Sequence, residues 1–272
     1  MTPALDVVIV SYNTRDHLLA CLASLRAAPP SGLGRVFVVD NASTDGSADA
    51  ARQAWPGVVE LRALERNAGF AAANNVAMRE STAALILLLN SDTRVPAGAI
   101  DTLVERLEVT GAAAGGPRLC DGHGRPELSF GPMLTPLGEA RQKYRVWRAG
   151  LDAGWARRRT EALLAHEREV DWVTGACLLV RRDQALAAGL FDERFFLYEE
   201  DVDFCAALRA RGGRVLFTPA AEVVHLRGRS PGGSAAGPAL YDRSHLAFYE
   251  KHAPAWAPLL RLWLQVRGRS IR

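Results

Sequence analysis

Short apolar runs alternate with stretches of helical periodicity along the first half of the chain. Residues 5–10, 35–39 and 84–89 are apolar runs typical of buried strands, whereas the leucines within 18–25 recur at the spacing of one helix face. Strands that alternate with helices favour a doubly wound, mostly parallel sheet of the α/β class. We therefore expect ligands to bind beyond the carboxyl ends of the strands.

Polar side chains follow the predicted strands at these carboxyl ends. Ser11 and Asn13 follow the first strand, Asp40 ends the second, and Asn90 and Asp92 follow the fourth. We expect the topology to bring them together at one edge of the sheet. Asp92 stands at the end of a rigid strand, which suits a divalent cation that holds diphosphate oxygens. A cap for the following helix is the alternative role of this residue.

The regular pattern breaks after residue 117. Residues 120–170 are rich in Gly and Arg, and basic side chains gather within 141–159. Such a cluster predicts either a solvated basic face or contact with anionic lipid headgroups or an anionic acceptor.

Regular structure resumes in the last hundred residues. The pattern predicts a strand over 171–180, a helix from an acidic cluster at 199–203 to about 211, short strands over 215–217 and 221–226, and an amphipathic helix over 254–266. The last helix either packs on the catalytic domain or rests on a membrane surface.

Composition excludes several classes of protein. The chain has 272 residues, of which 49% are hydrophobic and 23% charged, and its net charge of +3 gives no support for a nucleic-acid partner. Its four cysteines form no C-x-x-C pair, which predicts small buried residues in a reducing compartment. No basic segment opens the chain, and the apolar run 83–89 is too short for a membrane span, so we expect a cytoplasmic protein.

The common nucleotide-binding motifs are absent from the first strand–helix turn. Neither the Rossmann G-x-G-x-x-G nor the P-loop pattern follows residue 10. A dehydrogenase and a P-loop ATPase therefore lose their main support.

Six motifs in order along residues 5–230 resemble family 2 glycosyltransferases with the GT-A fold, and most of all their rhamnosyltransferase-like branch, which builds bacterial surface polysaccharides. The motifs are VVDNASTDGS at 38–47, RNAGFAAAN at 66–74, LLLNSDT at 87–93, WVTGACLLVR at 172–181, GLFDERFFLYEEDVD at 189–203 and HLRGRS at 225–230. The resemblance implies a nucleotide-sugar-binding half over 1–118, an acceptor and catalytic half with a smaller acceptor-side subregion over 119–238, and C-terminal helices over 239–272.

The resemblance also implies roles in binding the donor. Asp40 would accept a hydrogen bond from N3–H of a uracil or thymine base, and Asp45 would either neighbour the nucleoside or form a turn. The other implied donor-binding residues are Ser11 and Asn13 at the nucleoside, Asn67 and Gly69 in the turn before a helix, Asn90 at a ribose hydroxyl, and Arg227, which we expect to contact the diphosphate from a closing Gly-rich segment.

The implied metal site lies where the family carries its Asp-x-Asp motif. Asn90 replaces the first aspartate here, so Asp92 would hold Mg²⁺ or Mn²⁺ with one ligand charge fewer. His225 matches the late histidine of the family and would complete the site, although a structural role is the alternative for a single histidine.

The resemblance assigns the catalytic base to the acidic cluster. In an inverting transfer the acceptor hydroxyl loses its proton as it attacks, so a positioned carboxylate is required. Asp201 matches the base of the family, and Glu200 is the second candidate. Glu199 and Asp203 are expected to be solvated or to cap the helix.

These residues predict a metal-dependent, inverting glycosyltransferase that uses a dTDP- or UDP-linked sugar, with rhamnose as the first candidate. We expect the acceptor to be a glycan or a lipid-linked hydroxyl, and contact with the inner face of the plasma membrane remains an alternative for a cytoplasmic chain. Two other functions stay open, a sugar-1-phosphate nucleotidyltransferase and a non-catalytic nucleotide-sugar-binding module.

Overall fold

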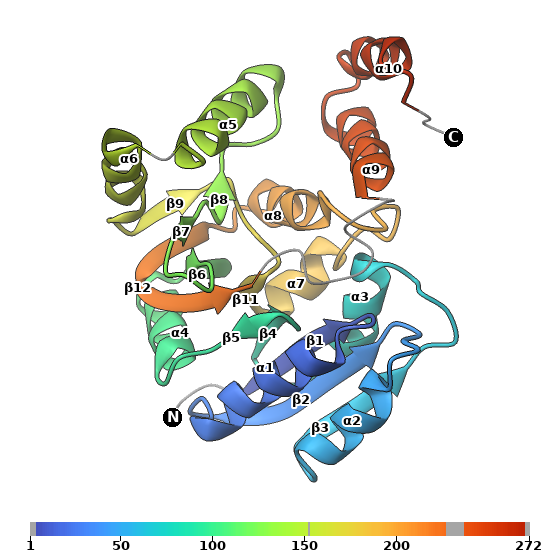
Figure 1. The fold of residues 1–272 in the computed structure, drawn as a ribbon, viewed down its shortest axis with the longest axis vertical. Helices are drawn as coiled ribbons and strands as arrows, with labels where there is room; N and C mark the ends of the chain where they lie inside the picture. Colours follow the sequence, from blue (N-terminus) through green and yellow to red (C-terminus); the bar gives the residue numbers. More distant parts are fainter. Residues whose placement is uncertain (1–3, 152, 227–236, 270–272) are drawn as a thin grey trace.

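The structure is a computed structural model that describes residues 4–151, 153–226 and 237–269 (Figure 1). Its strands are β1 (Leu5–Ser11), β2 (Leu33–Asp40), β3 (Val59–Ala63), β4 (Leu85–Asn90), β5 (Thr93–Arg94), β6 (Ala114–Cys120), β7 (Pro126–Glu127), β8 (Phe130–Gly131), β9 (Arg168–Val170), β10 (Trp172–Val173), β11 (Cys177–Arg181) and β12 (Val215–His225). Its helices are α1 (Arg15–Ala27), α2 (Ser47–Ala54), α3 (Phe70–Glu80), α4 (Ala99–Thr110), α5 (Pro136–Ala149), α6 (Gly154–Leu164), α7 (Arg182–Ala188), α8 (Glu200–Ala210), α9 (Gly237–His252) and α10 (Ala257–Val266).

One large sheet runs through the molecule in the order β3–β2–β1–β4–β11–β6–β12–β5, with β7 beside β6 and β9 beside β12. β3, β2, β1 and β4 are parallel, as are β6 and β12, while β11 lies antiparallel between β4 and β6. The predicted mostly parallel α/β sheet is therefore confirmed. Because β11 inserts beside β4, residues after 170 reach the strands that open the chain.

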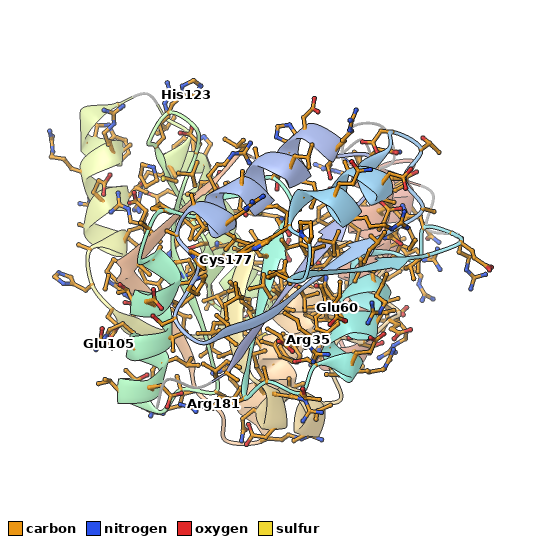
Figure 2. The ribbon with its side chains drawn as sticks, turned by 90° about the horizontal axis from the view of Figure 1, so that it is seen from below. Arg35, Glu60, Glu105, His123, Cys177 and Arg181 are labelled. Carbon is orange, nitrogen blue, oxygen red and sulfur yellow. The ribbon has the colours of Figure 1, made fainter. Side chains whose placement is uncertain are left out.

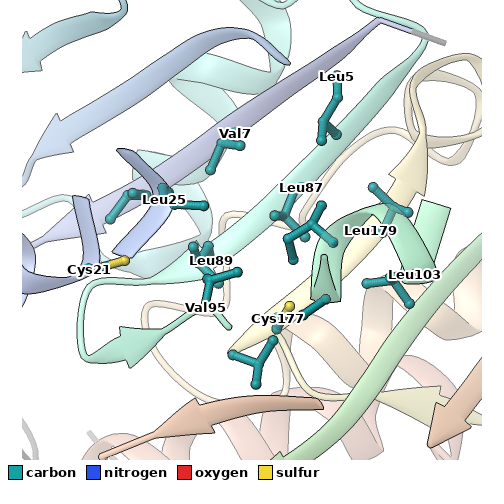
Figure 3. Packing of buried hydrophobic residues seen from close by; sticks show 14 of the residues in the cluster. Leu5, Val7, Cys21, Leu25, Leu87, Leu89, Val95, Leu103, Cys177 and Leu179 are labelled. Atoms are coloured by element: carbon teal, nitrogen blue, oxygen red, sulfur yellow. The ribbon is translucent and has the colours of Figure 1, made fainter. Parts of the chain in front are cut away.

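Helices cover both faces of this sheet. Leu5, Val7 and Ile9 of β1 pack into the core beneath α1 and α4, whereas Val8 packs into the core beneath α3 and α8. Figure 3 shows the first core, in which Leu87 lies among side chains of β1, α4 and β11. With both faces covered, the carboxyl edge of the sheet is left for polar side chains.

The amino ends of the strands are held by ion pairs at the opposite edge. Figure 2 shows Arg35 of β2 and Glu60 of β3 side by side, with 3.9 Å between Nη1 and Oε1. The same guanidinium lies 3.0 Å from the buried carboxylate of Asp6 in β1. These contacts fix the register of strands whose other ends carry the candidate site.

The cysteines behave as predicted from their spacing. Cys21, Cys120, Cys177 and Cys205 are all buried and unpaired. Burial raises the pKa of Cys21 to about 11, so its thiol is neutral at ordinary pH. They act as small apolar residues of the core.

Three details of the pattern differ from expectation. Residues 120–170 are not irregular but contain α5 and α6, and the predicted strand 171–180 is broken at 174–176 into β10 and β11. Strand β12 runs unbroken from 215 to 225 with a bulge between Thr218 and Glu222, where two short strands were expected. At this break Gly175 turns its N–H to α8, where it donates to Asp201 Oδ2 at 2.8 Å.

Helices α9 and α10 form a third cluster with the segment that precedes α8. Phe248 of α9 and Leu264 of α10 pack with Phe195 and Val202. Among the described residues, no helix is long and apolar enough to cross a membrane.

Candidate active site

The polar residues predicted to converge do meet at the carboxyl edge of the sheet. In the strand register Ser11 lies opposite Asp40, and Val10 lies opposite Asn90. Thr14 Oγ1 lies 2.9 Å from Ser91 Oγ, which ties the loop after β1 to the loop after β4. The Ser11 side chain is buried, and its hydroxyl oxygen lies 3.0 Å from that of Thr14. This contact orders the loop after β1.

Asp40 has one carboxylate oxygen without a hydrogen-bond partner. The residue is 3% exposed at the end of β2, and its Oδ2 accepts a hydrogen bond from Ser43 N at 2.9 Å. Its Oδ1 is buried and has no partner among the residues that the structure describes. A buried, unsatisfied acceptor is unfavourable unless a ligand supplies a donor. The N3–H of a uracil or thymine base is a donor of this kind.

The turn after β2 is built by side chains of the loop after β1. Asn13, whose φ of 52° lies in the left-handed region, accepts a hydrogen bond from Thr44 N at 2.7 Å. Asp45 accepts hydrogen bonds from Arg15 N at 2.9 Å and from Ser47 N at 3.0 Å. Slight burial raises the pKa of Asp45, but these bonds outweigh it and lower the pKa below its usual value. Of its two expected roles, the contacts of Asp45 favour the turn.

Gly69 brings the carboxyl edge of the sheet against the segment before α8. Its φ of +89° suits glycine, and a Cβ at this position would lie 2.5 Å from Phe196 O. Asn67 Oδ1 accepts the Gly69 N–H at 3.0 Å, and Phe70 N donates to Phe196 O at 2.7 Å. The turn 67–69 therefore sets the distance between the carboxyl edge of the sheet and the segment that leads to the acidic cluster.

Asp92 and His225 form a buried pair at the edge. Asp92 Oδ1 lies 3.3 Å from His225 Nε2, and Glu127 Oε2 lies 3.2 Å from His225 Nδ1. Burial favours the neutral forms of both partners, but their mutual interaction dominates. It lowers the pKa of Asp92, and the carboxylates of Asp92 and Glu127 raise the pKa of His225 to about 9.

Asn90 joins this pair to the second half of the chain. Its Nδ2 lies 3.4 Å from His225 Nε2, and its backbone N donates to Ala176 O at 3.0 Å. Asn90, Asp92 and His225 therefore lie together, as the sequence predicted. Across residues 4–151, 153–226 and 237–269, however, no group of three or more His, Cys, Asp or Glu side chains has the geometry of a metal site.

Asp201 is hydrogen-bonded to Gly175, the residue next to the backbone partner of Asn90. Asp201 Oδ2 accepts the Gly175 N–H at 2.8 Å, next to Ala176, whose carbonyl holds Asn90. Burial raises the pKa of Asp201 to about 6, and the charge of Glu199 adds to this rise, while the Gly175 hydrogen bond opposes it. A carboxylate with this pKa is ionised at neutral pH and still accepts a proton more readily than an ordinary aspartate.

Glu200 is buried deeper than Asp201 and differs from it in charge. Its Oε2 is buried without a hydrogen-bond partner in the described part of the chain. Burial, and then the negative charges of Asp201 and Glu199, raise its pKa well above the usual value. The uncharged form of Glu200 is therefore favoured more than in an ordinary glutamate, which favours Asp201 as the base.

The expectation that Glu199 and Asp203 are solvated or cap a helix is wrong. Both are buried, and the Glu199 side chain makes no cap hydrogen bond to α8. Glu199 Oε1 lies 3.1 Å from His245 Nδ1, and Asp203 accepts hydrogen bonds from Lys251 and His252. These partners lie on α9, so the acidic cluster is clamped by a helix that follows it in sequence.

This clamp holds a strained backbone segment. Tyr198 and Glu199 have φ values of 73° and 67°, in a region that is unfavourable for residues with side chains. Besides the Glu199–His245 contact, Ser244 Oγ donates to Leu197 O at 2.8 Å. Sequence reasoning missed this role of His245 and Ser244, because no local motif marks a contact between α9 and the segment before α8.

The clamp predicts a pH dependence of stability. Glu139 and Glu199 flank His245 and raise its pKa from 6.5 to about 9, against the effect of burial. A folded-state pKa above the unfolded one stabilises the protein fully below pH 6.5, and this contribution disappears as the pH rises through 9. We expect His245→Gln to lower the free energy of unfolding by roughly 3 kcal/mol at pH 6 and by much less at pH 9.5.

Urea denaturation of both proteins at the two pH values measures this difference. A destabilisation of equal size at pH 6 and pH 9.5 would show that the charge of His245 contributes nothing.

Arg227 lies outside the described residues, so its expected contact with the diphosphate is not part of this geometry.

The chain is similar in sequence to known glycosyltransferases. The model of "Glycosyl transferase family 2" matches residues 6–160. N-acetylglucosaminyl-diphospho-decaprenol L-rhamnosyltransferase of Mycobacterium tuberculosis is 33% identical over 289 residues, which cover 97% of this chain and 90% of that protein. O-antigen biosynthesis protein RfbC of Myxococcus xanthus is 26% identical over 91% of this chain, which corresponds to 19% of that longer protein.

Solved structures share the fold. GalNAc-T7, solved with UDP, GalNAc and Mn²⁺, superposes with a TM-score of 0.65 at 17% identity over 91% of this chain and 48% of its own. Mannosyltransferase PcManGT from Pyrobaculum calidifontis, solved with GDP-Man and Mn²⁺, gives 0.64 at 19% identity over 96% of this chain and 69% of its own. The predicted GT-A fold is thereby confirmed, and the sequence match and the shared architecture agree that the chain belongs to glycosyl transferase family 2.

Proposed function

We propose that the protein transfers a rhamnosyl group from dTDP-rhamnose to a hydroxyl of a lipid-linked sugar, with inversion at the anomeric carbon. The observation that carries this proposal is the ionisable carboxylate of Asp201, held by Gly175 beside the polar edge that ends in Asn90. A binding module has no need for a base at that position, and family membership favours sugar transfer over nucleotidyl transfer. In this assignment residues 1–118 bind the donor and 119–238 supply the base and the acceptor side, with 239–272 flanking them.

The nucleobase would bind at Asp40. Its partnerless Oδ1 fits the N3–H that thymine and uracil share. We choose the thymidine nucleotide because the mycobacterial relative is named as an L-rhamnosyltransferase. Ser11, Asn13, Asp45, Asn67 and Gly69 support this site by shaping the loops around it.

A divalent cation would be held by Asp92 and His225. Two ligands of one octahedral ion lie about 3 Å apart, and Asp92 Oδ1 and His225 Nε2 are 3.3 Å apart, so a cation would take the place of the Nε2 proton, which would be released to solvent. Glu127 on the other ring nitrogen fits the outer carboxylate that orients a metal-bound histidine. Two protein ligands are enough where the phosphates of the donor and water complete the shell. When bound, Mg²⁺ or Mn²⁺ would neutralise charge on the leaving diphosphate.

The chemical step then follows from the position of Asp201. The acceptor hydroxyl attacks the anomeric carbon, and its proton passes to an Asp201 oxygen as the bond from that carbon to the diphosphate oxygen breaks. The products are the glycosylated acceptor and dTDP, and a single displacement inverts the configuration. Burial and the neighbouring carboxylates raise the pKa of Glu200, which disfavours a further negative charge beside the leaving diphosphate.

A lipid-linked acceptor places this reaction at a membrane. The acceptor in the name of the mycobacterial relative is a diphospho-decaprenol lipid. We propose that the protein works as a peripheral protein at the inner face of the plasma membrane, where such a lipid and a cytoplasmic nucleotide sugar meet.

The direct test is transfer with defined substrates. The protein is incubated with Mn²⁺, a prenyl-diphosphate-linked N-acetylglucosamine and, in turn, dTDP-rhamnose, a UDP-sugar and GDP-mannose. We expect a glycosylated lipid only with dTDP-rhamnose, and NMR of the product should show the inverted anomeric configuration. Retained configuration, or dTDP release without a glycosylated lipid, would refute the proposed reaction.

Asp40→Ala should weaken donor binding selectively. Loss of one hydrogen bond to a charged acceptor is worth about 1.5–3 kcal/mol, so we expect the dissociation constant of dTDP to rise roughly 10- to 100-fold. Calorimetric titration measures this change, with Asp49→Ala on the exposed face of α2 as a control. If Asp40→Ala binds dTDP as tightly as Asp49→Ala does, the nucleobase does not bind at Asp40.

A further inference from the structure

A large groove lies between α5, α9 and α10, apart from the donor edge. It has a volume of about 720 Å³, within the roughly 300–1,000 Å³ that small-molecule sites occupy. Its apolar lining comes from aromatic and leucine side chains, namely Tyr198, Tyr241, Trp256, Leu259, Leu260 and Trp263. Figure 1 shows α9 and α10 standing beside α8, on the side of the molecule away from β2 and β3.

This lining is unusually exposed for apolar side chains. Leu259 is 58% exposed and Trp263 is 45% exposed, on the same face of α10. A set of large apolar side chains left open around a hollow marks a binding site. At about 30 Å³ per non-hydrogen group, the groove holds roughly two dozen atoms, which is the size of a short prenyl chain with a diphosphate.

The groove ends at the catalytic cluster. Tyr198, in the strained segment three residues before Asp201, lines it. His245, whose Nδ1 lies 3.1 Å from Glu199 Oε1, lines it from the α9 side. A molecule that fills the groove therefore has one end at Tyr198 and at the His245–Glu199 contact, two residues before the proposed base, and the other at the surface of α10.

The charges of the groove suit an anionic head group. The lining has three cations for two carboxylates, since His245 and Lys143 both pair with Glu139 while Arg269 pairs with Asp242. Arg267 does not line the groove but lies next to it, with its guanidinium 4.3 Å from the centre of the Trp263 ring. An apolar chain with a diphosphate head matches these apolar walls and cations better than a neutral lipid or an acidic peptide does.

From these observations we propose that the groove binds the prenyl chain and diphosphate of the lipid-linked acceptor, so that its sugar reaches Asp201. This inference rests on the proposed function for the identity of the lipid. It assigns to Trp263 and Leu259 a role in recognising the lipid, which is separate from donor binding.

The test is calorimetric titration of the whole protein with farnesyl diphosphate. We expect Trp263→Ala and Leu259→Ser each to raise its dissociation constant tenfold or more, while Trp155→Ala, a 47% exposed tryptophan on α6 outside the groove, leaves it unchanged. We also expect inorganic diphosphate to bind at least tenfold more weakly than farnesyl diphosphate.

Several results would overturn the proposal. Equal affinity of all three variants, equal binding of inorganic diphosphate, or binding to anionic phospholipid vesicles without competition by farnesyl diphosphate would each exclude a prenyl site. If light scattering shows that the wild type is a dimer and Trp263→Ala a monomer, the groove would instead be assigned to a second copy of the chain. Titration of the wild type with dTDP distinguishes the two proposals. If the protein binds dTDP but not farnesyl diphosphate, only the groove proposal is rejected. If it binds neither, the proposed function is rejected as well.

Discussion

Asp201→Asn is expected to lower the rate of sugar transfer by roughly 10²–10⁴-fold and to leave dTDP affinity nearly unchanged. General-base catalysis contributes about this much, and an amide keeps the shape of the side chain but cannot accept the proton of the hydroxyl. The amide oxygen can still accept the Gly175 N–H, so the local structure should persist. Single-turnover transfer and dTDP titration together separate loss of the base from loss of the donor site.

Glu200→Gln is the matched control for this substitution. Burial raises the pKa of Glu200 well above its usual value and so favours the uncharged carboxyl, which an amide resembles in shape and charge. We therefore expect a rate loss much smaller than that of Asp201→Asn. A larger loss in Glu200→Gln than in Asp201→Asn would exchange the roles of the two residues.

The pH profile of the wild type gives an independent check on the same base. Asp201 must be ionised to act, and its pKa is raised to about 6. Transfer should therefore increase with pH through about 6 and level off above 7. A rate of transfer that is constant between pH 5 and pH 7.5, with dTDP binding intact, would show that Asp201 does not accept the proton.

The strand ends were predictable because one rule governs them. Ser11, Asp40 and Asn90 each follow a buried apolar run, and parallel strands deliver such residues to one edge. The same reasoning could not place Glu127, which lies 98 residues from His225 in the chain and follows no pattern of its own. A contact between distant segments leaves no periodicity in either of them.

The missed helices have a different physical cause. Helix α5 buries little of its surface, and its Leu137 and Trp147 side chains are exposed, so the apolar positions do not mark one face against a core. Its start carried a local signal, since Thr135 caps the helix through Gly138 N and Pro136 stands at its first turn. The apolar residues of α5 lie on the surface, so they do not recur at the spacing of a buried helix face. A search for buried-face periodicity therefore does not find this helix.

The prediction that Glu199 and Asp203 are solvated or cap the helix also failed because of contacts between distant segments. A run of acidic residues at a helix start is usually solvated, and sequence alone does not reveal that Lys251, His252 and His245 arrive from α9 to neutralise it. The carboxylates of the run therefore differ in charge and role, although they stand side by side in the chain.

Asp92→Asn is the second change with a large expected effect. It removes the only charged oxygen ligand of the proposed cation pair, while Asn90 already lacks a charge. Loss of an outer-shell partner weakens metal binding about 10- to 100-fold, so loss of this direct ligand should weaken Mn²⁺ binding by at least about 100-fold. Electron paramagnetic resonance of free Mn²⁺, titrated with protein and dTDP, measures this without any turnover.

Two further variants decide whether the pair with His225 is what matters. Glu127→Gln keeps the size of the group on His225 Nδ1 but removes its charge, so we expect a 10- to 100-fold weaker affinity for Mn²⁺. Asp49→Asn, an exposed carboxylate on α2, should leave the affinity as it is. If Asp92→Asn binds Mn²⁺ as tightly as Asp49→Asn does, the Asp92–His225 contact is a structural ion pair, and the charge on the leaving diphosphate must be balanced by other groups of the protein.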